Sequence, residues 1–328
     1  LPYEEFVNKD LIHFSNYNLE RSIPNVMDGL KTSQRKILYS AFKRNLKTEI
    51  RVAQFAGYVS EHSGYHHGEA SLNDAIVGMA QDFVGSNNIA WFVPQGQFGT
   101  RLQGGSDAAS PRYIHTYLQP YVKNLVPADD FAVLTYRDDD GLPVEPEWYA
   151  PILPMLLVNG ARGIGTGYST FIPPFNPTHL KNMILKWLET GTGLDDAIVP
   201  WTRGFEGKIT MEKATECILS GKLEGDTITE LPVGTWTADV REKLDDLVKD
   251  GKLKDYTDMS TDMKVCIKVK VEDKSVLDKI LTDKWKLTNM HAFDSKCVIR
   301  KYATPNEILK EFVAVRLDLY LSLIHISE

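Results

Sequence analysis

The chain of 328 residues is long enough for two domains, and its 25% charged and 43% hydrophobic residues are ordinary for a globular protein. No run of about 18 apolar residues is present, so neither a membrane-spanning helix nor a membrane partner is expected. Three cysteines at long spacings fit neither a disulfide framework nor a zinc site, and a chain that begins at Leu1 rather than Met is expected to be a fragment.

The net charge of −7 hides an uneven distribution along the chain. Between Arg21 and Arg51, eight basic residues are opposed only by Asp28 and Glu49, which leaves this segment at +6. Residues 129–147 carry seven acids against one arginine. Clustered positive charge neutralises phosphates, so the basic segment is a candidate nucleic-acid contact. A solvated basic helix face is the alternative.

Residues 22–92 show the apolar periodicity of helices. Thr32 or Ser33 is expected to cap the first strongly patterned helix, with Lys31 and Arg35 four positions apart at its start. One phosphate could contact both charges together with the free N–H groups of the first turn. Lys31 and Arg35 are therefore candidate phosphate ligands.

A second helix is expected after Gly68, with the polar stretch SGYHHGEAS as a turn between the two helices. Helix, turn and helix with basic ends fit an arrangement that reads a DNA groove. A plain helical bundle would show the same periodicity. From Ile89, aromatic and apolar runs cut by glycines predict short strands and a flexible hairpin, the wing of a winged helix. Its glycines are expected to let the backbone approach DNA closely.

The segment RYIHTYLQPYVKNLV is expected to be a helix or a helix-like return, and it begins with Arg112 and Tyr113 after a loop of small residues. A phenol is a poor nucleophile at neutral pH. A cation beside it favours the phenolate and can hold a nearby phosphate. Arg-Tyr is a common dipeptide, so a structural role is the alternative for this pair.

In the second half of the chain, PILPMLLVNG is predicted to be a buried strand and GARGIGTGYSTFIPPFNP a loop with special backbone geometry. Residues 205–300 mix strands with charged helices, which suggests an α/β domain. A helix follows, with Thr304 as N-cap, Pro305 in its first turn and Glu307 closing a capping box. Its apolar seam is typical of the start of a coiled coil. The final LSLIHISE breaks this seam and is expected to be foreign to the natural sequence.

Six ordered motifs resemble those of the eukaryotic DNA topoisomerase II family: SIPNVMDGLKTSQRKILYS, YHHGEASL, FVGSNNI, QGQFGTRLQGGSDAASPRYI, EPEWYAPILPMLLVNGARGIGTGYST and IPPFNP. The match is with the DNA breakage–reunion core of that family, and it extends to about Tyr320. Bacterial gyrase A-type subunits share the scheme, but they usually carry a proline within the histidine motif, where this chain has YHHGE.

The resemblance implies an α+β fold with three parts. These are a winged-helix domain over residues 1–145, an α/β tower domain over 146–302 and the start of a coiled-coil dimer-gate helix over 303–328. It also implies transient double-strand DNA breakage, strand passage and religation. Tyr113 would attack a backbone phosphorus and leave a 5′-phosphotyrosyl link. Arg112 would hold the phosphate, and His67 would serve as a donor or proton relay.

The resemblance further implies the contacts with duplex DNA. His66, Lys31, Arg35 and Arg21 would contact the DNA, and Ile164 would act as an apolar wedge that unstacks a base step and bends the duplex. The active form would be a nuclear homodimer. Mg²⁺ and ATP would be bound by domains absent from this chain, which carries no metal site and is expected to cleave poorly alone.

Two other functions stay open on the sequence. A tyrosine recombinase-like enzyme would form a 3′ link without Mg²⁺, but it does not account for QGQFGTR and NGARGIGTG. A non-enzymatic winged-helix protein that bends DNA would leave Arg112, Tyr113 and His67 without a role.

Overall fold

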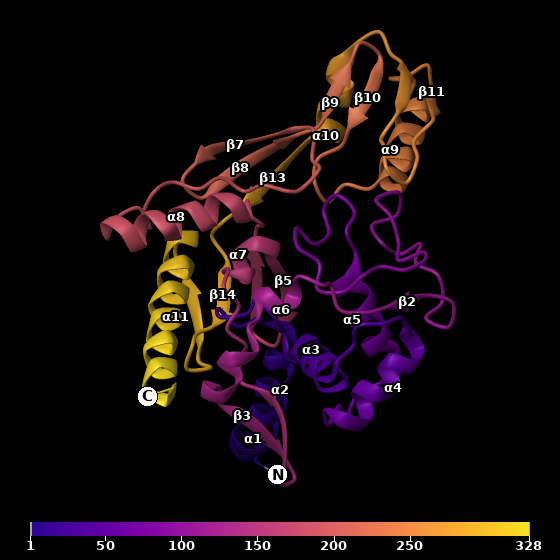
Figure 1. The fold of residues 1–328 in the computed structure, drawn as a ribbon. Coiled ribbons are helices and arrows are strands. Elements are labelled where there is room, and N and C mark those ends of the chain that lie inside the picture. Colours follow the sequence, from indigo (N-terminus) through magenta and orange to yellow (C-terminus); the bar gives the residue numbers. More distant parts are fainter. Residues whose placement is uncertain (1, 328) are drawn as a thin grey trace.

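The fold is known from a computed structural model that describes residues 2–327 (Figure 1). Its helices are α1 (Tyr3–Phe6), α2 (Ile12–Ser22), α3 (Thr32–Arg44), α4 (Val52–His62), α5 (Glu69–Ala80), α6 (Val122–Leu125), α7 (Met155–Asn159), α8 (Pro177–Thr190), α9 (Thr237–Lys249), α10 (Asp278–Leu281) and α11 (Pro305–Ser327). A π-helical segment η1 (Val7–Leu11) joins α1 to α2, and two 3₁₀ turns are η2 (Ala128–Val133) and η3 (Lys274–Leu277).

The strands are short and form several small antiparallel sheets. They are β1 (Ile50–Arg51), β2 (His115–Thr116), β3 (Tyr136–Asp139), β4 (Leu142–Pro146), β5 (Ala161–Gly165), β6 (Tyr168–Ile172), β7 (Lys208–Lys213), β8 (Glu216–Ser220), β9 (Lys222–Glu224), β10 (Thr227–Glu230), β11 (Asp255–Asp258), β12 (Ile267–Lys270), β13 (Thr282–Lys286), β14 (Met290–Phe293) and β15 (Ile299–Tyr302).

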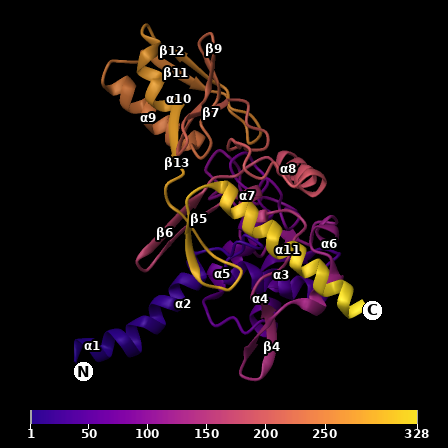
Figure 2. The ribbon, with the colours of Figure 1, turned by 90° about the vertical axis from the view of Figure 1, so that its left-hand side faces the viewer.

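Helices α3, α4 and α5 pack against one another as the periodicity predicted. Their apolar faces bury Leu38, Phe55 and Ile76 completely, so this cluster forms the rigid base of the N-terminal part. By contrast, α1, η1 and α2 form one arm that projects from the body (Figure 2). Most side chains of α1 and η1 are exposed.

The prediction that RYIHTYLQPYVKNLV is helical is wrong, because its backbone hydrogen-bonds to distant extended segments. His115 and Gln95 exchange two backbone hydrogen bonds of 3.0 and 3.1 Å, and β2 pairs with β1 through Ile50 and Thr116. Only α6, at the end of this segment, is helical. A backbone N–H committed to a neighbouring strand cannot also serve a helix.

Two further expectations in the second half are also wrong. PILPMLLVNG contains the helical turn α7, in which Leu157 and Val158 donate their N–H groups to the carbonyl of Pro154. A short apolar run does not distinguish a buried strand from a buried helix. The glycine-rich stretch that follows forms the antiparallel hairpin β5–β6 instead of an irregular loop.

The tower region rises from this body at the top of Figure 1. The sheet β7–β8–β13 leads to a second sheet in the order β11–β12–β10–β9, which α9 covers. The second sheet has its own apolar core, in which Ile228, Leu244 and Ile267 are fully buried. The other large cluster of buried side chains includes Ile37, Leu157 and Phe312, so it crosses the domain boundaries expected at 145 and 302. Those boundaries stay predictions.

Helix α11 begins after Thr304 as predicted, but the Glu307 carboxylate bonds to Ala303, one residue before the expected N-cap. The Oγ1 atom of Thr304 accepts a hydrogen bond of 3.3 Å from the N–H of Glu307, whose carboxylate accepts one of 2.9 Å from Ala303. Ile308 and Phe312 are buried along its seam. The helix continues through LSLIHIS, where Ile324 and Ile326 are exposed.

A buried ion pair joins the wing to the tower. The guanidinium of Arg101 pairs with the carboxylate of Glu230, and both side chains are less than a tenth exposed. Glu230 also accepts hydrogen bonds from the N–H groups of Glu206 and Leu231, at 3.1 and 2.9 Å. The buried negative charge of Glu230 is thus balanced by a guanidinium and two N–H donors. The ion pair fixes the wing against the tower.

Replacing Arg101→Ala should reduce the free energy of unfolding by about 3–5 kcal/mol, because it leaves a buried carboxylate without its counter-charge. Urea denaturation followed by circular dichroism measures this change. Lys284→Ala is the control, since Lys284 pairs with Glu212 and Glu216 on an exposed face and should change stability little. If both substitutions lowered the free energy of unfolding by the same small amount, the stabilising role of the Arg101–Glu230 ion pair would be contradicted.

Candidate functional site

The segment around Tyr113 is bonded to the first turn of α4. The N–H of Ala53 donates to the carbonyl of Pro111 at 3.1 Å, and that of Val52 donates to Ile114 at 3.0 Å. Ile114 is buried beneath the segment, whereas the Tyr113 side chain is 77% exposed. A fixed backbone therefore presents a phenol to solvent.

Arg112 is exposed beside it. Within the described part of the chain, neither the Arg112 guanidinium nor the Tyr113 hydroxyl has a hydrogen-bond or ion-pair partner. Both groups are therefore available to a ligand from outside the chain. A cation next to a phenol suits a phosphate, whose oxygens a guanidinium can bind in a bidentate manner.

The wing glycines serve packing within the protein. A Cβ on Gly99 would lie 2.5 Å from Gly105, and a Cβ on Gly104 would lie 2.3 Å from the Trp236 ring of the tower. Close packing within the protein is therefore enough to explain Gly99 and Gly104, and the predicted close approach of DNA to them stays a prediction. Thr100 closes the loop through hydrogen bonds of 2.8 and 2.5 Å to Asp107. The loop that precedes Tyr113 is rigid because it folds on itself and rests on the tower.

Three of the predicted residues, Arg21, His66 and His67, line one polar cleft of about 190 Å³ between α2, α3 and the β3–β4 hairpin. His67 is hydrogen-bonded to the hydroxyl of Tyr17 on α2. His66 contacts the Asp139 carboxylate at 3.3 Å. The cleft thus brings together groups that can donate to a phosphate, alongside the carboxylates of Glu20, Asp138, Asp139 and Glu145. Sequence reasoning missed Tyr17.

The structure does not bring His67 into contact with Tyr113. The Tyr113 segment binds the first turn of α4, whereas His67 follows the last turn of the same helix. A helix of 11 residues is about 16 Å long. Among the described residues no hydrogen bond or ring contact connects the two side chains. His67 is instead in contact with Tyr17 of α2 and with Tyr65.

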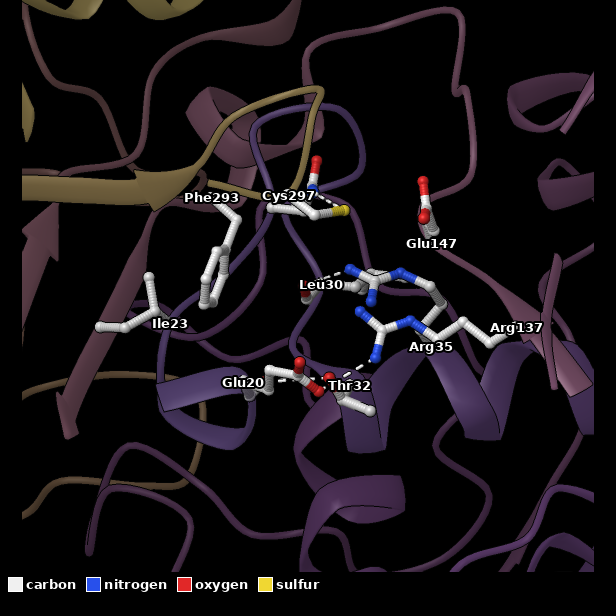
Figure 3. Close-up of a pocket in the computed structure, with 10 residues that line it drawn as sticks. Glu20, Ile23, Leu30, Thr32, Arg35, Arg137, Glu147, Phe293 and Cys297 are labelled. Atoms are coloured by element: carbon white, nitrogen blue, oxygen red, sulfur yellow. Dashed lines mark hydrogen bonds and ion pairs between the residues drawn. The ribbon is translucent and has the colours of Figure 1, made fainter. Parts of the chain in front are cut away.

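Arg35 does not lie where a DNA phosphate could reach it, which corrects the expectation for this residue. Its side chain is 3% exposed and donates to the Asp28 carboxylate at 2.7 and 3.0 Å and to the carbonyl of Leu30 at 2.7 Å. Figure 3 shows its guanidinium beside a small pocket that Cys297 also lines. Residue spacing placed Arg35 on a helix face, but the packing of α3 turned that face inward.

Lys31 has a structural contact of its own. Its Nζ donates to the carbonyl of Arg162 on β5 at 2.7 Å, and burial lowers the pKa of this amine. Lys31 is also the N-cap of α3, one position before the expected Thr32 or Ser33, and its N–H donates to Gln34 Oε1 at 2.9 Å. It fastens the start of α3 to the β5–β6 hairpin.

The β5–β6 hairpin lies flat on α2. A Cβ on Gly163 would be 1.9 Å from the carbonyl oxygen of Ser22, and one on Gly165 would be 2.9 Å from the side chain of Leu19. Neighbouring residues of a strand face opposite sides, so Ile164 points away from α2. Its side chain is 85% exposed. The alternating glycines of GIGTG were a signal for this strand that the sequence reasoning missed.

The comparisons with known proteins agree with this geometry. Residues 21–326 match the family model of the A-type subunit of DNA gyrase/topoisomerase IV. The chain belongs to this family. It is 47% identical to DNA topoisomerase 2 of Saccharomyces cerevisiae and 45% identical to that of Penicillium chrysogenum, in each case over 98% of this chain. The resemblance to the eukaryotic branch is thereby confirmed.

A solved structure is similarly close. The crystal structure of the Plasmodium falciparum topoisomerase II DNA-binding, cleavage and re-ligation domain has a TM-score of 0.92 and 43% sequence identity, and it matches 98% of this chain and 46% of that one. The chain spans 24% of the yeast relative and 21% of the Penicillium relative. The mixed helix and sheet content expected from the sequence is confirmed.

Residues 2–327 contain neither a metal cluster nor a membrane helix. No three His, Cys, Asp or Glu side chains within this range gather into a group that could hold a metal ion. No helix in the same range has the length and apolar character needed to cross a membrane.

Gly163→Ala should lower the free energy of unfolding by about 1–3 kcal/mol, because the new methyl group forces β5 away from the Ser22 carbonyl. Gly57→Ala should raise it by about 0.5–1 kcal/mol, since Gly57 lies within α4 and a Cβ there meets no atom. Thermal unfolding followed by circular dichroism compares the two. Stabilisation by both substitutions would show that β5 does not rest on α2.

Proposed function

We propose that this chain is the DNA-binding and cleaving part of a type II DNA topoisomerase, an isomerase that breaks and reseals both strands of duplex DNA. The observation that carries the proposal is the exposed, unpartnered pair of Arg112 and Tyr113 on a backbone bonded to α4. It occurs in a chain that is similar throughout to a structure titled as a DNA-binding, cleavage and re-ligation domain.

The proposed reaction is a transesterification. The Tyr113 phenol oxygen forms a bond to a backbone phosphorus, and the bond from that phosphorus to the deoxyribose 3′ oxygen breaks. The phenolic proton is transferred away and a proton reaches the departing 3′ oxygen, so a 3′ hydroxyl and a 5′-phosphotyrosyl link result. Religation is the same exchange in reverse, and no fuel is needed because the link retains the ester bond.

Arg112 is proposed to stabilise the charge that accumulates on the phosphoryl oxygens. A fixed donor at such a position is worth about 10²–10³-fold in rate. His66, His67 and Arg21 are proposed to contact the DNA backbone from their cleft, with His67 as a phosphate donor away from the Tyr113 of its own chain. Lys31 acts on DNA through its hold on the hairpin, and Arg35 has no direct part.

Ile164 is proposed to wedge into a base step. An apolar side chain that inserts between bases unstacks them and kinks the duplex. The residue is exposed on β5, one position before the end of the strand, in a hairpin whose other face rests on α2, so its position is defined by packing. The bend would bring the duplex toward both the hairpin and the Tyr113 segment.

The full reaction needs more than this chain. A duplex has two strands, so a homodimer that supplies two tyrosines is proposed. Mg²⁺, which would neutralise charge at the cleaved phosphate, and ATP, which would drive strand passage, are proposed to bind other parts of a longer polypeptide. A nuclear location is proposed from the eukaryotic relatives, although one relative, from Dictyostelium discoideum, is named mitochondrial.

Tyr113→Phe should abolish covalent protein–DNA adducts, because phenylalanine lacks the attacking oxygen. The chain is combined with the metal-binding part of a type II topoisomerase, Mg²⁺ and end-labelled duplex, then denatured and examined for protein-linked DNA. Tyr121→Phe is the matched control. Burial raises the pKa of Tyr121 to about 12, and its hydroxyl is hydrogen-bonded to Ala90, so adduct formation should survive this change.

The position of the adduct decides between classes of protein. An adduct on the 5′ end that the Phe variant lacks supports the proposal. An adduct on the 3′ end would assign the chain to the tyrosine recombinases. Tight, bent binding without an adduct would favour a DNA-bending protein, provided that an authentic full-length topoisomerase cleaves in the same assay.

Ile164→Ala should reduce the bend of bound duplex, because alanine is too short to separate a base step. Fluorescence transfer between dyes at the two duplex ends reports the bend. Ile326→Ala is the control, since Ile326 is 64% exposed near the end of α11 and has no proposed DNA contact. An unchanged transfer efficiency in the Ile164 variant would rule out the wedge.

A further inference from the structure

Arg162 lies on the same strand face as Ile164. The two residues are separated by one position on β5, which corresponds to about 6.6 Å along a strand. Gly163 between them faces α2, so the side chains of Arg162 and Ile164 both leave the hairpin on the side away from that helix. Arg162 is exposed, and its charge is therefore presented beside the tip of the proposed wedge.

The Arg162 guanidinium is held in place by an aromatic ring. It stacks over Phe171 at 4.9 Å, and Phe171 is its direct partner in the β5–β6 register. Phe171 is fixed in turn by an edge-on contact with Trp285 at 5.6 Å and by a backbone hydrogen bond of 2.9 Å to Asn289. A guanidinium stacked on a ring keeps its N–H edge free for hydrogen bonds.

No carboxylate neutralises this arginine. The segment from residue 161 to 172 contains no acidic residue, and among the described residues the Arg162 side chain has no ion pair. By contrast, Arg101, Arg137 and Arg316 each pair with a carboxylate. Arg162 is thus an ordered positive charge without a counter-ion in the described part of the chain.

Space for a ligand is present next to the charge. Arg162, Phe171 and Trp285 line a hollow of about 260 Å³ between the hairpin and the tower. The backbone of Arg162 is fixed from the other side by Lys31, whose Nζ donates to the Arg162 carbonyl. This hydrogen bond holds the β5 backbone in place when a ligand binds the Arg162 guanidinium.

We propose that Arg162 binds a backbone phosphate of the duplex that Ile164 bends. This inference rests on the proposed function, and it identifies Arg162 as a further DNA-binding residue that anchors the strand beside the unstacked step. The planar guanidinium can take two phosphate oxygens at once. Stacking on Phe171 reduces the side-chain freedom that would otherwise be lost on binding.

The test is the salt dependence of duplex binding by the full chain, measured by fluorescence anisotropy. Each phosphate contact contributes a slope of about 0.9 in the plot of log affinity against log salt. Arg162→Gln should reduce the slope by about that amount, so the loss of affinity between 50 and 200 mM salt becomes about threefold smaller. Arg162→Lys keeps the charge and should preserve the slope.

Arg300→Gln is the matched control. Arg300 is also exposed and stacked on a ring, over Tyr302 at 4.7 Å, but it lies on β15 outside the hairpin and is paired with the Glu311 carboxylate at 3.8 Å. Its replacement should leave the slope unchanged. An equal fall in slope for the Arg300 and Arg162 variants would overturn the proposal, because it would report only the net charge of the chain. An unchanged slope in Arg162→Gln would overturn it as well.

The result separates this inference from the proposed function. If Ile164→Ala loses the bend and Tyr113→Phe loses the adduct while Arg162→Gln keeps its slope, the function stands and the phosphate contact is wrong. If the parent chain does not bind duplex, both are wrong. Thermal unfolding of each variant verifies that the substitution left the fold intact.

Discussion

Asp28 and Arg35 form a buried ion pair on which the N-terminal half of the structure depends. Besides the Arg35 guanidinium, the Asp28 carboxylate accepts hydrogen bonds from the N–H groups of Leu30 and Tyr149 at 3.0 and 2.9 Å. These contacts join the turn before α3, the helix itself and the segment that leads to α7. Because the carboxylate and guanidinium are almost fully buried, removal of either partner would leave a charge without compensation.

The position of the β5–β6 hairpin, which carries Ile164, depends on where this ion pair places α3. Once α3 is placed, Lys31 at its start holds β5 through the carbonyl of Arg162, and α2 lies against the glycine face of the same strand. Gly29, in the turn between α2 and α3, likewise approaches Leu156 so closely that a Cβ would lie 2.7 Å from its nitrogen. The Asp28–Arg35 ion pair places α3, and close contacts of α2 and α3 with β5 then place the exposed Ile164.

The proposed functional groups lie on separate rigid supports. Tyr113 and Arg112 lie between Pro111 and Ile114, which accept hydrogen bonds from the first turn of α4. The histidine cleft follows the last turn of α4 in sequence, and Ile164 projects from the β5–β6 hairpin. The tower reaches the wing through Arg101 and Glu230. Under the proposed function, a duplex would meet groups that packing already holds in place before DNA binds.

The sequence by itself determined the family, the identity of the exposed tyrosine and its arginine neighbour, and the capped start of α11. These features depend on local residue order, and ordered motifs or a capping box can be recognised without a partner segment. The family resemblance also singled out Ile164, which the structure shows to be exposed, although the strand on which it lies was not predicted. Local patterns specify which groups are present and where helices can begin.

Only the tertiary structure decided which groups face solvent and which segments pair. It buried Arg35, moved the cap of α3 to Lys31, and took the segment after Tyr113 into pairing with β1 instead of a helix. It also placed His67 against Tyr17 and Tyr65, with no hydrogen bond or ring contact to Tyr113 among the described residues, and ordered Arg162 over a ring. The physical reason is that a periodic pattern defines a face, whereas the element that covers this face comes from a distant part of the chain.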